Sequence, residues 1–245
     1  MKKTDINEVR NTSVALAYTV PIKDESGLGV ISHPFTNTVM AADYSQPLVV
    51  DGQKVMSFTP LDLRIEENKE KWLSQISETI KKEDLLHIYM MVNTPYKLTW
   101  LKFCKDYMSI KDFTEYFANA WVLSENPNGD INVTTREMTG WYRECPKEYL
   151  MVEEDKAVYD AIPEEITLYR GVAKNRNPYG LSYTASHDKA VWFMNRWYKG
   201  EGYIITLNVK KKDILAYFNT RNEDEYVVDT TKYKKEIEKQ IPDGK

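Results

Sequence analysis

The chain has few of the residues that build disulfide frameworks or metal sites. Its 245 residues include two cysteines, Cys104 and Cys145, and three histidines. Two cysteines alone form neither a disulfide framework nor a zinc site, and His33 and His87 have no neighbours at metal-ligand spacing. We therefore expect reduced cysteines and no metal site, which suits a cytoplasmic protein.

Long apolar runs and an excess of positive charge are also absent. The charged start, MKKTDINEVR, is not followed by the apolar segment of a signal peptide. No apolar run approaches the ~18–20 residues that cross a bilayer. The net charge of −4 differs from the basic balance typical of nucleic-acid-binding proteins. We therefore expect a soluble chain with neither a membrane nor a nucleic acid as its partner.

The residues that are present suffice for a folded core. Hydrophobic residues make up 42% of the chain, and the charged residues are well mixed along it, which argues against disorder. In residues 1–60, short apolar or alternating runs over residues 14–20 and 47–58 are broken by turn signals. We expect this segment to be a separate extension of short strands and loops, whose role the sequence does not reveal.

A helical period begins at residue 66. Trp72, Ile76 and Ile80 recur at intervals of four residues between charged ones, which predicts an amphipathic helix. Capping-box-like sequences begin at Ser109 and Thr134. Residues 124–130 are rich in turn signals. Further helices are expected around residues 98–104, 109–121, 134–145 and 152–161.

Beyond residue 163 the pattern alternates as in β-strands, with one helix inserted. Helices followed by a β-rich half indicate an α+β fold. We expect one domain over residues 61–245, made of a helical lobe (61–162) and a β-rich core (163–245). Strands are expected at residues 166–170, 181–184, 203–209, 214–218 and 225–228, with a helix capped by Ser186 between the second and third and a charged helix at 233–241.

Three short motifs in the β-rich half carry chemistry. They are an arginine followed by glycine at 170–171, Ser-Tyr-Thr at 182–184 and Glu-Asp-Glu at 223–225. Taken singly, each motif has a commoner structural interpretation. The arginine is more often part of a surface ion pair, Ser-Tyr-Thr more often an ordinary half-buried strand, and Glu-Asp-Glu more often a solvated charge cluster. Alternate residues of a strand share a face, so we expect Glu223 and Glu225 to point into one cleft.

Together these residues suit cleavage of NAD at its nicotinamide–ribose bond. The barrier lies in forming an oxocarbenium-like ribose, and a carboxylate such as Glu225 stabilises that cation. The fork of Arg170 matches phosphate oxygens. The Ser182 hydroxyl can fix the carboxylate or the ribose by hydrogen bonds. Glu223 can then orient a basic nucleophile such as a guanidinium.

The order of these motifs resembles the R-S-E class of mono-ADP-ribosyltransferases, which includes clostridial and cholera-like toxins and several phage enzymes. The similarity covers roughly residues 166–229, and the Ser-Tyr-Thr strand departs from the family's Ser-Thr-Ser in its middle position. The resemblance implies a mixed β-sandwich core that binds NAD. It makes Glu225 the catalytic glutamate, Arg170 the NAD-binding arginine and Glu223 the residue associated with arginine acceptors.

The resemblance also extends to ligand contacts. A helical aromatic-x-x-Arg stretch implies, by this resemblance, that Phe193 lies by nicotinamide and Arg196 by phosphate. Taken alone, the helical spacing of Phe193 and Trp197 favours a core over ligand contacts. Residues 217–222 are the expected substrate-recognition loop, with Tyr217 and Phe218 available for docking. The expected NAD contacts are Arg170, Gly171, Ser182, Thr184, Phe193, Arg196 and Glu225.

The leading functional prediction is transfer of ADP-ribose from NAD to an arginine of a host or bacterial cytosolic protein, in a bacterial cell or phage-infected cytosol. NAD is a co-substrate in this reaction, and no metal is implied. Two alternatives remain open: an NAD glycohydrolase with water as acceptor, and a non-catalytic interaction protein on the same fold. The target protein, the acceptor residue and the oligomeric state are not readable from the sequence.

Overall fold

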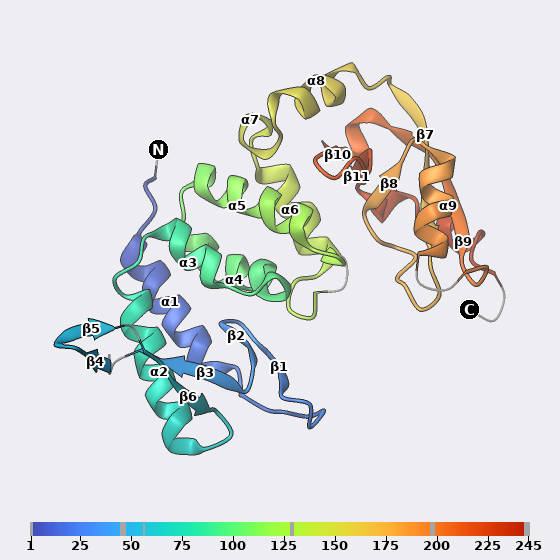
Figure 1. Cartoon of the computed structure of the whole chain (residues 1–245). Coiled ribbons are helices and arrows are strands. Elements are labelled where there is room, and N and C mark those ends of the chain that lie inside the picture. Colours follow the sequence, from blue (N-terminus) through green and yellow to red (C-terminus); the bar gives the residue numbers. More distant parts are fainter. Residues whose placement is uncertain (1, 45–47, 56, 128–129, 197–198, 243–245) are drawn as a thin grey trace. The chain divides into compact units, whose positions relative to one another are not determined.

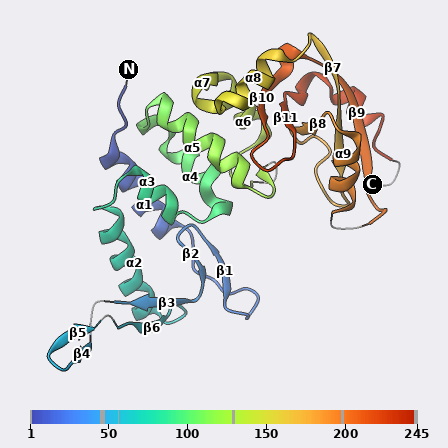
Figure 2. The same ribbon diagram turned by 45° about the horizontal axis from the view of Figure 1, so that its top comes forward.

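A computed structural model describes residues 2–44, 48–55, 57–127, 130–196 and 199–242. The chain divides into two compact units, residues 1–109 and 110–245 (Figures 1 and 2). The helices expected over 61–162 are therefore shared between the two units. The separate role expected for residues 1–60 stays a prediction.

The first unit opens with a helix where the sequence predicted short strands and loops. α1 (Ile6–Thr19) begins at Asp5, whose carboxylate accepts hydrogen bonds from two backbone N–H groups of the first turn. Its buried face holds Val9, Ser13 and Leu16, at the spacing of a helix. The expectation of a strand over 14–20 was wrong, because the apolar run is the second half of this face.

Three antiparallel hairpin-like pairs follow α1. Short strands and loops were expected over residues 47–58, and β4 (Leu48–Val50) and β5 (Gln53–Val55) confirm the strands; Pro47 and Met56 lie outside the described residues. The pairs are β1 (Val30–His33) with β2 (Thr36–Thr38), β3 (Met40–Asp43) with β6 (Thr59–Asp62), and β4 (Leu48–Val50) with β5 (Gln53–Val55).

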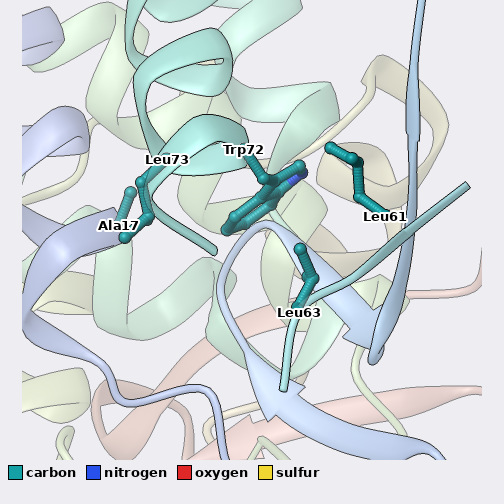
Figure 3. Packing of buried hydrophobic residues seen from close by; sticks show 5 residues of the cluster. All are labelled: Ala17, Leu61, Leu63, Trp72 and Leu73. Carbon is teal, nitrogen blue, oxygen red and sulfur yellow. The ribbon is translucent and has the colours of Figure 1, made fainter. Parts of the chain in front are cut away.

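The helices of the first unit are α2 (Glu66–Ile80), α3 (Leu85–Met91) and α4 (Lys97–Cys104). α2 and α4 confirm the helical period, whereas the short α3, which begins at the Asp84 cap, was not predicted. One apolar cluster joins α1, α2 and the β6 region (Figure 3). It consists of Ala17, Leu61, Leu63, Trp72 and Leu73.

The second unit begins with the helices α5 (Ile110–Leu123), α6 (Thr135–Glu144), α7 (Lys147–Leu150) and α8 (Glu153–Ala161). The expected capping box at Thr134 is confirmed, with the Thr134 and Glu137 side chains each accepting from the other's backbone N–H. α5 buries Phe113, Phe117 and Trp121, as predicted. Of the expected turn cluster at 124–130, residues 128 and 129 lie outside the described residues.

The second half of this unit is one antiparallel sheet of order β10-β11-β8-β7-β9. Its strands are β7 (Glu165–Val172), β8 (Ser182–Thr184), β9 (Tyr203–Lys210), β10 (Ile214–Phe218) and β11 (Glu225–Val228). The α+β class is thus confirmed. Instead of the expected mixed sandwich, the described residues of this unit contain a single sheet with antiparallel pairings.

Two helices accompany the sheet. α9 (His187–Asn195), capped by Ser186 as expected, lies over β7, β8 and β9 (Figure 1). α10 (Lys234–Glu238) contacts β9 and is shorter than the helix expected at 233–241. Within the described residues, no helix combines the length and the apolar composition needed to cross a membrane.

The contact between α9 and β7 depends on a glycine. A Cβ atom on Gly171 would lie 2.6 Å from the Met194 amide nitrogen and still closer to the Ala190 carbonyl oxygen. Both neighbours are helix backbone and cannot rotate away. Gly171 therefore follows Arg170 because α9 packs directly on the strand at this position.

We predict that Gly171→Ala lowers the free energy of unfolding by about 1–3 kcal/mol, because the added methyl group overpacks the α9–β7 contact. Gly140→Ala is the matched control: a Cβ there meets nothing within 4 Å, and alanine favours the interior of α6. Denaturant unfolding of both variants measures the difference. Equal stabilities would contradict the close approach of α9.

Candidate functional site

The second unit contains a cavity of about 140 Å³ lined in part by residues of β7, β8 and β11. The order β11-β8-β7 puts the three sequence motifs on neighbouring strands, since Thr184 pairs with Tyr169 on one side and with Glu225 on the other. The predicted residues that line the cavity are Arg170, Gly171, Ser182, Thr184, Phe193, Arg196, Glu223 and Glu225.

Glu225, the first residue of β11, is the half-buried carboxylate of this cavity. The indole Nε1 of Trp121 donates a hydrogen bond of 3.1 Å to its Oε1, and the Ser182 side chain also hydrogen-bonds it. Burial raises the pKa of Glu225. The hydrogen bonds from Ser182 and Trp121 oppose that rise, the charge of Glu223 adds to it and that of Arg170 reduces it. The net result is a raised pKa.

Arg170 hydrogen-bonds to backbone carbonyls in the wall of the cavity. Its Nη1 donates to the Ser182 carbonyl oxygen at 2.9 Å, and its Nη2 donates to the Asn177 carbonyl oxygen at 3.0 Å. Gly180 leaves room for the guanidinium, because a Cβ there would lie 2.5 Å from the Arg170 Cζ. The Nε–H is buried and has no hydrogen-bond partner among the described residues. This leaves a buried cationic donor without an acceptor.

Glu223 reaches the cavity by a different route from the one the sequence suggested. The strand begins only at Glu225, so the argument from alternating strand residues was wrong. Asn222 and Asp224 instead take left-handed backbone conformations, with φ of 55° and 53°. The turn they form places Glu223 at the wall of the cavity, where it lies with Glu225.

Two side-chain hydrogen bonds hold this turn through Asp224. Tyr217 Oη donates to Asp224 Oδ1 at 2.8 Å, and Thr184 Oγ1 donates to Asp224 Oδ2 at 3.3 Å. Asp224, the middle residue of the Glu-Asp-Glu motif, therefore anchors the turn. It is absent from the cavity lining.

The expected docking role of Tyr217 and Phe218 is corrected. Both residues belong to β10, and their exposed fractions are only 4% and 5%. The strand continues to Phe218, so the loop begins at Asn219, and neither ring is presented to a protein partner. Tyr217 supports the Asp224 turn, while Phe218 borders a small second hollow next to Glu223 and Glu225.

Phe193 lines the cavity from α9 and packs edge-on against Trp192 with ring centroids 4.9 Å apart. Trp192 is 56% exposed, and the Arg196 guanidinium lies 5.3 Å from its ring centroid. This aromatic and cationic edge was only partly predicted. Trp197, expected at helical spacing from Phe193, lies outside the described residues.

Sequence reasoning missed a set of ion pairs at the cavity. Glu125 pairs with Arg196 at 2.8 Å and lies 3.7 Å from Arg221. Arg221 in turn pairs with Glu223 at 3.0 Å. All four residues line the cavity. Arg196 and Glu223 were expected at the site. Glu125 and Arg221 lie in polar loops, where charged residues are common, so no sequence signal separated these two from solvated charges.

Trp121 was predicted only as a core residue. Its ring is buried, but a buried indole N–H requires an acceptor, and here that acceptor is Glu225. The pairing spans 104 residues of sequence, so only the tertiary structure reveals it.

The cavity can hold a cationic reaction centre beside a carboxylate and an anionic group beside Arg170. Among the described residues, no cluster of three or more His, Cys, Asp or Glu side chains is arranged to hold a metal ion. Comparison of the chain with models of known protein families, with curated proteins and with solved structures finds no match.

We predict that Glu225→Gln stabilises the fold by ~1 kcal/mol at neutral pH, as is common when a strained functional site is relaxed. The folded-state pKa of Glu225 is raised, so ionisation costs the folded state more than the unfolded state. Below the unfolded pKa this cost vanishes, and it grows as the pH rises toward neutrality. Thermal unfolding from pH 4 to 7 measures the trend.

The exposed Glu148 on α7 provides the control, since its replacement by glutamine removes one charge outside the cavity. Glu225→Gln must gain stability relative to Glu148→Gln as the pH rises. Parallel pH profiles would show that burial of the Glu225 carboxylate does not strain the fold.

Proposed function

We propose that this chain is a mono-ADP-ribosyltransferase, which cleaves NAD at the nicotinamide–ribose bond and transfers ADP-ribose to an arginine of a protein. The observation that carries this proposal is the Glu225 carboxylate at the cavity wall, fixed by Trp121 and Ser182 and close enough to Arg170 for the two charges to interact. We also propose that the chain is arranged as this family's fold is, with a helical lobe followed by a β-rich core that binds NAD.

Glu225 supplies electrostatic stabilisation in the proposed reaction. The nicotinamide leaves from a cationic ring as a neutral molecule, so no general acid is needed. Positive charge then develops on the ribose. A carboxylate already held by two donors does not have to reorient to meet that charge. Trp121 and Ser182 therefore serve as positioning residues for Glu225.

Arg170 suits the pyrophosphate of NAD. Each of its two terminal nitrogens donates one hydrogen bond to a backbone carbonyl, and the buried Nε–H has no acceptor among the described residues. Contact of a phosphate oxygen with that donor requires the cavity wall to move, and the contact would then satisfy the donor with a charge-assisted hydrogen bond. Arg176 and Arg196 line the same cavity and add positive charge.

Glu223 is assigned to the acceptor. Its carboxylate already pairs with a guanidinium, that of Arg221. The same geometry would hold an arginine of a target protein and take up the proton that the arginine loses on attack. This assignment favours arginine transfer over hydrolysis. The proposed site of action is the cytoplasm of a bacterial or phage-infected cell.

We predict that Glu225→Gln slows release of nicotinamide from NAD by about 10²–10³-fold, the usual loss when one electrostatic stabiliser of a transition state is removed. Glu223→Gln should retain nicotinamide release but lose transfer of label from NAD to arginine. The assay incubates wild type and both variants with labelled NAD and a bacterial lysate. Glu148→Gln should match the wild type in both readouts.

Each alternative has its own result in this experiment. Free ADP-ribose without labelled protein identifies a glycohydrolase. Absence of NAD binding in calorimetry of the folded wild type identifies a non-catalytic interaction protein. Unchanged nicotinamide release by Glu225→Gln would overturn the mechanism.

The pH dependence gives an independent prediction. Activity needs the Glu225 carboxylate, so it falls as the pH drops through the raised pKa of this residue. The acid limb of nicotinamide release should lie at a higher pH than that of an ordinary glutamate. Because the charge of Glu223 contributes to the rise, Glu223→Gln should move the limb to lower pH. If the acid limb of nicotinamide release lies at the same pH in the wild type and in Glu223→Gln, the group that titrates is not Glu225.

A further inference from the structure

Arg221 occupies the position that the proposed function assigns to an acceptor arginine. It lies in the turn between β10 and β11, and its Nη2 is 3.0 Å from Glu223 Oε1. Its Nη1 donates to the Val122 carbonyl oxygen at 3.1 Å, which fixes the plane of the guanidinium. Arg221 lines both the main cavity and the small second hollow together with Glu223 and Glu225.

Three other arginines of this unit have different partners. Arg170 is bound to two backbone carbonyls, and Arg143 pairs with Asp229. Arg196 lines the cavity but pairs with Glu125. The guanidinium of Arg221 pairs with Glu223.

We propose that Arg221 is a self-modification site, ADP-ribosylated by the chain that carries it. This inference rests on the proposed function. It names the Arg221 guanidinium, in the turn between β10 and β11, as an acceptor of ADP-ribose within the chain itself. Glu223 holds Arg221 beside the cavity, and both belong to one chain. The reaction is therefore intramolecular and does not pay the entropy of bringing two molecules together. The Arg221 side chain is 32% exposed, which leaves room for the added group at the cavity wall.

The reaction balances with NAD as the only co-reactant. The bond from ribose C1′ to the nicotinamide nitrogen breaks, and its electron pair leaves with neutral nicotinamide. The lone pair of the Arg221 Nη2, after loss of its proton to Glu223, forms the new bond to C1′. Arg221 then carries a bulky group with two negatively charged phosphates. Since this group lies against Glu223, a modified chain can no longer place a foreign guanidinium there.

The test incubates the purified full chain with NAD and maps the modified residue by peptide mass spectrometry. Wild type should gain one ADP-ribosyl group at Arg221, and the fraction modified per unit time should not depend on protein concentration. Arg221→Lys should lose the modification. It should also label a small guanidine compound for longer, because its acceptor position is not blocked. Arg136→Lys, at an exposed residue of α6 that lines neither cavity, should behave as the wild type.

Failure of this inference is distinguishable from failure of the proposed function. Nicotinamide release with labelling of the guanidine compound, but with Arg221 unmodified, overturns self-modification and leaves the transferase in place. No nicotinamide release from the folded wild type overturns both. A modification rate that rises with protein concentration shows transfer between molecules and also overturns the intramolecular proposal. Circular dichroism of Arg221→Lys verifies that this variant is folded.

Discussion

The site depends on keeping one carboxylate charged where burial favours its neutral form. Burial and the neighbouring Glu223 raise the pKa of Glu225, while Ser182, Trp121 and Arg170 favour its ionised form. The same balance gives Glu225 its chemical value, because a poorly solvated carboxylate interacts strongly with a cation that forms beside it. The ionised Glu225 therefore suits a transient positive charge but lowers the stability of the protein without a ligand.

That balance requires parts of the chain far apart in sequence to be held at fixed positions. Arg170 ties β7 to the carbonyl of Ser182, whose side chain contacts Glu225. Gly171 lets α9 pack on the same strand and bring Phe193 to the cavity. The Asp224 turn then sets the position of Glu223. Each motif residue therefore has a structural role as well as a proposed chemical one.

The sequence was sufficient where a pattern is local. The period of α2, the capping box of α6 and the strands of the second unit follow from residue spacing, and so does the α+β class. The sequence was insufficient where two local signals compete, since the apolar run in the second half of α1 fits both a strand and one face of a helix. Backbone geometry was equally hidden, since Asp224 adopts a positive φ that moves Glu223 off the strand. Contacts such as that of Trp121 with Glu225 arise only when distant segments meet.

The central claim is that the Glu225 cavity stabilises an oxocarbenium-like ribose derived from NAD. The most direct measurement is the secondary isotope effect on nicotinamide release from NAD deuterated at the ribose C1′. The account predicts a normal effect clearly above one, because C1′ becomes more planar as the nicotinamide leaves. An effect of one under conditions where chemistry limits the rate, or no nicotinamide release at all, would contradict it.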